Sequence, residues 1–310
     1  MVNESVPVLI TWDVDPDLWR PFEDRQRALN MAMELCHSQG IRATFFFTAQ
    51  PADTYLDEFD KMRAQGHELG CHGLTHGDEE NYDRMPEPMQ RAYIEQATER
   101  LQNLIGEPIR AFRSPHVKTS ATTLSLLARN GYLADSSVCS QRIDFVSSNL
   151  INIGWIFAPR RPYRPHRDSA FRSGALAIWE IPVSAAVIPF ISSALRVLGL
   201  PSMKVLFKLL HAESRRTGKP IVYLAHPTEF LAREGKVRKR EPWKWHVKRK
   251  YLTLSYTRIH GFRLRALLYK INGEALYQDT QDLFAYMASF PDVRFMTVSE
   301  YTSCNLGRVF

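Results

Sequence analysis

Near its start the chain reads Val6-Pro7-Val8-Leu9-Ile10-Thr11-Trp12-Asp13-Val14-Asp15, an apolar, β-rich run that ends in two carboxylates. A run of this kind, bounded by polar residues, predicts a buried strand over residues 6–13. Seven further runs predict strands at 42–48, 68–72, 111–114, 133–136, 177–183, 221–226 and 293–298. Helical stretches separate the early strands, which is the pattern of parallel βα units.

Four predicted helices lie between these strands, and each is followed by a glycine. They span 25–38, 57–65, 88–105 and 120–130, with Gly40, Gly66, Gly106 and Gly131 next to their ends. Glycine just past a helix suits the left-handed cap conformation. The chain has no internal repeat and no low-complexity linker, so we expect one α/β domain over residues 1–310. Seven or eight βα units predict a TIM-like barrel with its site at the carboxyl ends of the strands.

Composition and charge narrow the class of protein. The 310 residues contain no apolar run long enough to span a membrane, and the chain start lacks the pattern of a secretory signal, so we expect a cytoplasmic protein. The four cysteines have no paired spacing, which argues against a disulfide framework. The net charge is +7, and residues 233–250 alone hold nine Lys or Arg against two Glu. That basic segment indicates one anionic partner surface.

An insertion at about 185–216 interrupts the βα rhythm. Within it Met203, Leu206, Phe207 and Leu210 recur at helical spacing, so an amphipathic helix is predicted. The helix would pack on the barrel surface or, less often for such patterns, lie in a membrane interface.

Polar residues follow several of the predicted strands. Asp13 and Asp15 end the first, and the third runs into His72-Gly73-Leu74-Thr75-His76. A lone pair of acidic residues is also typical of turns. Two histidines with one carboxylate, however, leave a coordination position open for water, as a catalytic metal requires. The later strands end in this way at Arg113-Ser114-Pro115-His116, at Asp135 and at Leu224-Ala225-His226.

This ordered set resembles the NodB-homology polysaccharide deacetylases, whose fold is a distorted (β/α)7 barrel. That family has a first motif TFDD or a DxD variant, then H[ST]xxH, RxPY, an Asp-bearing motif and LxH. The matching segments are 11–15, 72–76, 113–116, 135–137 and 224–226. The chain departs from the family pattern at Val14, at Gly73 where a hydroxyl residue is usual, and at His116 where Tyr is usual.

The resemblance implies a metal site and a pair of proton-transfer residues. Asp15, His72 and His76 would hold Zn²⁺, or else Co²⁺, Ni²⁺, Mn²⁺ or Fe²⁺, so that water is activated and the amide carbonyl polarised. Asp13 would be the general base, and His226 would protonate the leaving amine.

Supporting roles follow from the same resemblance. Arg113 would pair with Asp13, and Asp135 would orient His226. The backbone N–H of His116 would stabilise the oxyanion, and its side chain would shape the substrate pocket. Glu180 and Glu229 would bind substrate hydroxyls or the amine, or would pair with nearby arginines.

The substrate is predicted from the missing export signal and from two segments. Residues 179–183 and 223–230 resemble a cytoplasmic branch of the family, which removes acetyl or formyl groups from polyprenyl-phosphate-linked sugars. The protein would then work at the inner face of the membrane, with segment 233–250 and its Trp243 and Trp245 on anionic headgroups or a lipid phosphate. That segment could instead be a solvated loop over the barrel, and without a recognition motif nucleic acid is not expected as a partner.

Two other functions remain open. The same metal site would serve a small soluble amide, as in allantoinase-like relatives. A protein without catalysis could bind glycans or membranes, although intact Asp13 and His226 argue against this.

Overall fold

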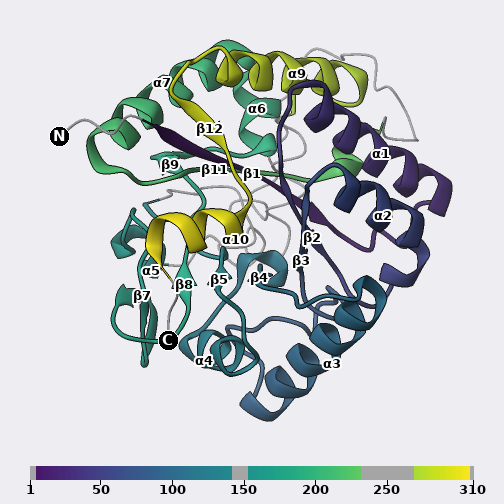
Figure 1. Ribbon diagram of the computed structural model, residues 1–310, viewed down its shortest axis with the longest axis vertical. Coiled ribbons are helices and arrows are strands. Elements are labelled where there is room, and N and C mark those ends of the chain that lie inside the picture. The colour runs from purple at the N-terminus through teal and green to yellow at the C-terminus, as the bar shows by residue number, and fades with distance from the viewer. Residues whose placement is uncertain (1–4, 142–152, 232–268, 308–310) are drawn as a thin grey trace, which may run out of the picture.

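A curled sheet of parallel strands forms the centre of the computed structural model, which describes residues 5–141, 153–231 and 269–307 (Figure 1). Seven strands follow the order β11-β1-β2-β3-β4-β5-β8, and all of these pairs are parallel. Their bounds are β1 (Val6–Val14), β2 (Thr44–Phe47), β3 (Glu68–Cys71), β4 (Ala111–Phe112), β5 (Ala134–Asp135), β8 (Trp179–Glu180) and β11 (Ile221–Ala225). An eighth strand, β12 (Val293–Phe295), pairs with the start of β1.

The two edges of this sheet meet through irregular backbone. The Ser184 N–H donates to the Val222 carbonyl at 3.1 Å, and the Val222 N–H donates to the Ser184 hydroxyl at 3.0 Å. Ile191 adds an isolated parallel bridge to Leu224. The result is the distorted seven-stranded barrel predicted for the chain.

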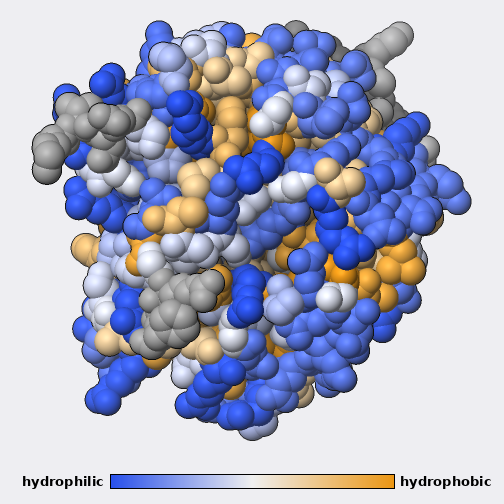
Figure 2. All heavy atoms as spheres, viewed as in Figure 1, coloured by the Kyte–Doolittle hydropathy of each residue, from blue (hydrophilic) through white to orange (hydrophobic). Residues whose placement is uncertain are grey.

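The helices lie around the outside of the strands (Figure 1). They are α1 (Phe22–Ser38), α2 (Leu56–Ala64), α3 (Glu87–Ile105), α4 (Ala121–Arg129), α5 (Ile153–Phe157), α6 (Ser192–Leu198), α7 (Leu200–Thr217), α9 (Glu274–Ala288) and α10 (Val298–Tyr301). Hydrophilic side chains cover most of the face seen in Figure 2. Two antiparallel hairpins join β6 (Pro165–His166) to β7 (Ser169–Ser173) and β9 (Ala185–Ala186) to β10 (Ile188–Pro189). Short helical turns are η1 (Ala52–Tyr55), η2 (Pro115–Val117), η3 (Pro227–Phe230) and η5 (Thr302–Leu306).

All eight predicted strands and all four predicted helices are present. The four glycines next to the helix ends have φ values between 63° and 82°, which confirms the left-handed conformation expected of them. The strands β4, β5 and β8 are shorter than predicted. Just past β5 the hydroxyls of Ser136 and Ser137 accept hydrogen bonds from Arg113 and Ser114, which follow the neighbouring strand β4, and these bonds accompany the early end of regular pairing.

The amphipathic helix predicted within 185–216 is α7, and its apolar stripe is buried. Met203, Leu206, Phe207 and Leu210 all belong to the core, and the Phe207 ring lies 5.3 Å from that of Phe290. Packing against the barrel is therefore confirmed, and an interfacial role for this stripe is wrong. Among the described residues no helix is long and apolar enough to cross a membrane. The basic segment 233–250 lies outside the described residues.

Side chains of β1 alternate between the barrel interior and the helical layer, because successive residues of a strand point to opposite faces. Thr11 and Asp13 contact Arg113 inside the barrel. Trp12 points the other way, where its ring lies 5.6 Å from Phe230 and 6.2 Å from Phe284. Burying Trp12 thus anchors the strand that carries both carboxylates.

Replacing Trp12 by alanine removes one of the largest fully buried side chains among the described residues. We expect Trp12→Ala to lower the free energy of unfolding by about 3–5 kcal/mol, because the lost apolar burial leaves a cavity. Urea denaturation measures this loss. Trp19, which is 73% exposed, is the matched control, and Trp19→Ala should change stability by less than about 0.5 kcal/mol. Equal losses in the two variants would contradict the packing described for β1.

Candidate active site

The buried base of the site is Arg113, which follows β4 and is fully enclosed. Its Nη1 donates to Asp13 Oδ1 at 2.7 Å and to Thr11 Oγ1 at 2.8 Å. Its Nε and Nη2 donate to the carbonyl and hydroxyl oxygens of Ser136 at 2.7 and 2.8 Å. A buried guanidinium needs such a full set of acceptors. The same contacts leave the second oxygen of Asp13 facing the histidines.

Three side chains converge on one point beside Asp13. The Oδ1 atom of Asp15 lies 3.4 Å from His72 Nε2 and 3.3 Å from His76 Nε2. One ligand atom from each of the three residues lies within 4.8 Å of the others. The spacing of Asp15, His72 and His76 in the sequence thus becomes a compact cluster at the carboxyl ends of β1 and β3.

The orientation of His72 is fixed by a backbone contact. Its Nδ1 lies 2.8 Å from the Arg113 carbonyl oxygen. With the proton on Nδ1, the ring donates to that carbonyl and turns the lone pair of Nε2 toward Asp15. Arg113 therefore holds Asp13 through its side chain and His72 through its main chain.

Charge–charge interactions in the cluster favour an ionised Asp15. Burial raises the pKa of this carboxyl, but the nearby charges of His76 and His226 lower the pKa by a larger amount. The net pKa of Asp15 is therefore well below its usual range. Burial in turn lowers the pKa of His76, which favours the neutral ring that a metal requires.

A divalent cation fits this cluster. Within the described part of the chain Asp15 Oδ1 is buried and has no hydrogen-bond partner, and a buried acceptor of that kind needs a cation or a donor. Two imidazole nitrogens and one carboxylate suit Zn²⁺ and related ions, and three protein ligands leave room for further ligands.

His226 faces the cluster from the end of β11. Its Nε2 lies 3.8 Å from Asp15 Oδ2 and 4.0 Å from Asp13 Oδ2, and 30% of its side chain is exposed, against 2% for His72. Burial lowers the pKa of His226, but the charges of Asp15 and Glu229 raise it to a net value above its ordinary one. A protonated, partly open imidazole can donate a proton to a bound molecule.

Asp135 and Glu180 form a buried acid pair. The Asp135 carboxylate accepts from the Ser137 hydroxyl at 2.7 Å, and Glu180 accepts from the Val138 N–H at 2.9 Å. Burial raises the pKa of Asp135 to about 6, while burial and the charge of Asp135 raise the pKa of Glu180 well above its ordinary value. Both shifts favour the protonated forms of these two carboxyl groups.

These contacts bear on two expected roles. Glu180 is fully buried beside Asp135, a geometry that supports neither a substrate contact nor the expected arginine pair. No contact from Asp135 to His226 occurs in the described residues, so the orienting role of Asp135 stays a prediction.

The two remaining predicted residues are Glu229 and His116. Glu229 pairs with Arg196 at 3.0 Å, which is the arginine partner expected as one of its alternatives. The His116 ring centroid lies 4.4 Å from that of His76. The backbone of His116 is left-handed, with φ of 57°. Burial and the charge of His76 lower the pKa of His116 to about 3, so this ring is neutral.

Two further residues support the site. Glu80 accepts hydrogen bonds from the loop between the two metal-site histidines, and the Ser137 hydroxyl accepts from the Ser114 N–H at 2.8 Å. Ser137 belongs to the matched segment 135–137, which could have pointed to it, whereas Glu80 stands in no recognised motif and only its position in space reveals it.

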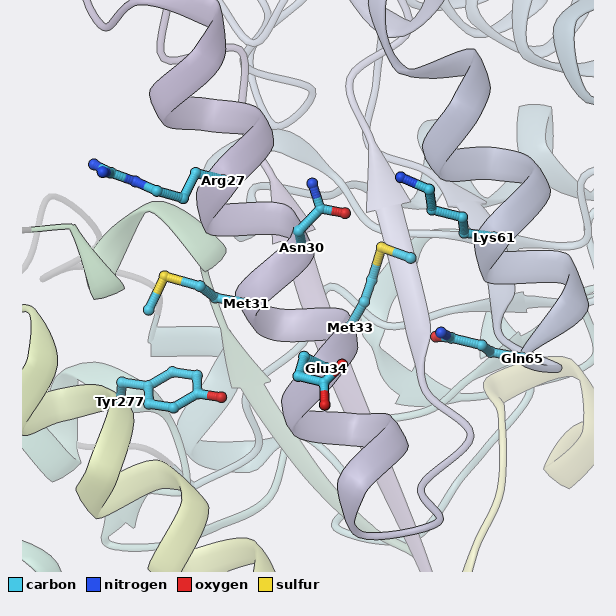
Figure 3. Close-up of a pocket in the computed structure, with 8 residues that line it drawn as sticks. All are labelled: Arg27, Asn30, Met31, Met33, Glu34, Lys61, Gln65 and Tyr277. Atoms are coloured by element: carbon cyan, nitrogen blue, oxygen red, sulfur yellow. The ribbon is translucent and has the colours of Figure 1, made fainter.

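A separate pocket lies on the outer surface between α1, α2 and α9 (Figure 3). Its lining includes Arg27, Glu34, Lys61 and Tyr277. None of the predicted site residues that the structure describes lines it, so it is distinct from the metal cluster.

Comparisons with known proteins agree with this geometry. Residues 3–134 match the family model for polysaccharide deacetylase. A chitin deacetylase from Pestalotiopsis sp is 31% identical over 137 residues, which cover 42% of this chain and 45% of that protein. The chain thus matches less than half the length of that relative.

Two solved structures share the fold. A polysaccharide deacetylase structure from Mycobacterium smegmatis superposes with a TM-score of 0.60 at 15% identity, covering 96% of this chain and 89% of that one. An allantoinase structure gives a TM-score of 0.59 at 15% identity, with 97% and 90% coverage. The matched residues 3–134 include Asp13, Asp15, His72, His76 and Arg113, so the part of the chain that is similar to the polysaccharide deacetylase family contains the Asp15–His72–His76 cluster.

Proposed function

We propose that the protein is a metal-dependent hydrolase that removes an N-acyl group, acetyl or formyl, from a sugar. The observation that carries this proposal is the convergence of Asp15, His72 and His76 next to a second aspartate, Asp13, and a third histidine, His226, that face the same point. When bound to these three ligands, a divalent ion, Zn²⁺ above all, supplies Lewis acidity that polarises the acyl carbonyl and acidifies water.

Asp13 is the proposed general base. Its Oδ1 is held by Arg113, whereas its Oδ2 lies 3.9 Å from His72 Nε2 and 4.0 Å from His226 Nε2. The free oxygen can take a proton from the attacking water, while the guanidinium keeps the carboxylate oriented.

His226 is the proposed general acid. An amide nitrogen leaves as an amine only if it is protonated, and the surrounding carboxylates raise the pKa of His226 against the effect of burial, which favours its protonated form. The N–H of His116 is the proposed donor to the charge that develops on the carbonyl oxygen.

For the substrate we propose a polyprenyl-phosphate-linked sugar at the inner membrane face. The positive charge of segment 233–250 supports this, and so does the outer side of α7, where Val205 and Leu209 are 59% and 58% exposed beside Lys208. Apolar and basic side chains together suit an anionic lipid surface. A small soluble amide is the alternative substrate for the same residues, and indifference to lipid would favour it.

The base assignment is tested by Asp13→Asn, which keeps the shape of the side chain and removes its basicity. We expect kcat to fall by about 10²–10⁴-fold, because the proton of water has no acceptor, while the bound-metal stoichiometry stays at the wild-type value. Steady-state kinetics and elemental analysis measure the two quantities. Asp53→Asn, at an exposed aspartate paired with Arg100, is the control. Unchanged hydrolysis in Asp13→Asn would refute the assignment.

The acid assignment is tested by His226→Gln with two leaving groups. We expect kcat/KM for an N-acyl sugar to fall by about 10²–10⁴-fold. The kcat/KM for the O-acyl analogue should fall far less, because an alcohol needs less protonation to leave than an amine. Comparing the two losses separates proton donation from a structural role. A loss of the same size for both substrates would rule out His226 as the acid.

The membrane proposal predicts binding to vesicles that contain anionic lipid. Wild-type protein should co-sediment with such vesicles at low salt and be released at high salt, because Lys and Arg near the surface contribute roughly 1 kcal/mol each. Neutralising Lys236, Arg238, Lys239 and Arg240 together should weaken the binding at least tenfold. Mass loss from lipid-linked N-acyl sugars and from their soluble headgroups is measured in parallel. Undiminished binding by the variant, or equal turnover of both substrates without lipid, would refute the proposal.

A further inference from the structure

The loop that carries His76 wraps around the carboxylate of Glu80. The backbone N–H of Leu74 donates to Glu80 Oε1 at 2.7 Å, and those of Thr75 and His76 both donate to Oε2 at 2.7 Å. Three successive N–H groups that point at one anion form a nest. The ligand of this nest is a side chain of the same chain.

The remaining contacts of Glu80 are also donors. Tyr82 OH donates to Oε1 at 2.7 Å, and the Thr75 hydroxyl, whose single proton is shared with Glu79 Oε1 at 2.9 Å, lies 3.1 Å from Oε2. Glu80 and Tyr82 are both fully buried. A buried group whose partners all donate suits an ionised carboxylate, which only accepts. Each of these bonds is therefore charge-assisted and about twice as strong as a neutral one.

Gly73 makes room for this carboxylate. A Cβ atom at position 73 would lie 2.5 Å from Glu80 Oε1 and 2.7 Å from the Pro115 ring, and Gly73 has φ of 77°. Both facts restrict the position to glycine. The hydroxyl residue usual after the first histidine of the family motif cannot fit here, because Glu80 occupies that space.

We propose that Glu80 is a positioning residue for the metal site, which it serves by holding the His72–His76 loop so that both imidazoles face Asp15. The inference rests on the metal-binding role proposed above. His76 has a left-handed backbone with φ of 58°, a conformation that costs free energy unless its surroundings enforce it. The bond from its own N–H to Glu80 supplies that constraint.

The decisive variant is Glu80→Gln, which keeps the side-chain volume but turns one acceptor oxygen into a donor. At least one loop N–H then loses its partner. We expect the Kd for Zn²⁺, measured by competition with a chromophoric chelator, to rise by about 10–100-fold, as is typical when a contact that orients a ligand is lost. Tyr82→Phe removes only one bond and should raise the Kd by about two- to tenfold.

Glu79→Gln is the matched control. Glu79 lies on the same loop and accepts only from the Thr75 hydroxyl among the contacts described, at 2.9 Å. The Kd of the Glu79→Gln variant for Zn²⁺ should equal that of the wild type. A wild-type Kd in Glu80→Gln would overturn the inference, and so would an equal rise in both glutamine variants.

A second measurement separates this inference from the proposed function. Amide hydrogen exchange in metal-free protein should be faster at Leu74, Thr75 and His76 in Glu80→Gln than in the wild type, with the core strands unchanged. If wild-type protein bound no Zn²⁺, the proposed function would fail, and local exchange alone would decide whether Glu80 holds the loop. Unchanged exchange at these three amides would overturn the positioning role.

Discussion

The ion pair between Asp13 and Arg113 is the constraint on which the rest of the site depends. Two charges inside a barrel are stable only if each has a full set of partners, and losing one partner of such a pair costs about 3–5 kcal/mol. Arg113 finds those partners on β1 and just past β5, and its carbonyl also orients His72. One buried guanidinium thereby ties three strand ends together and sets the position of the base relative to the metal ligands.

Four carboxylates in and around the site differ because their neighbours differ. Asp13 faces a guanidinium and Asp15 faces histidines; burial raises the pKa of Asp15, but the histidine charges bring it well below its usual range. Asp135 and Glu180 face each other, and burial raises the pKa of both, while the charge of Asp135 raises that of Glu180 further. A raised pKa stabilises the fold at low pH, and this contribution is lost as the pH rises through about 6 for Asp135.

Two departures from the family motifs, at Gly73 and at Asp15, can be understood from the contacts around them. Gly73 stands where a hydroxyl residue is usual, and the Glu80 carboxylate fills the space that a side chain there would need. Asp15 stands two residues after Asp13, just past the end of β1, where its Oδ1 faces the imidazoles of His72 and His76.

Local patterns in the sequence were enough to predict the eight strands and the helices that end at glycines, and the motif resemblance added the cluster of Asp15, His72 and His76. Those features depend on periodicity and on polar residues at the ends of parallel strands, which meet at one edge of a barrel. Tertiary structure alone decided that Glu180 meets Asp135, that Glu80 supports the His76 loop, and that the apolar stripe of α7 is buried. These outcomes depend on which side chains from different elements come into contact, and no local pattern encodes the identity of such partners.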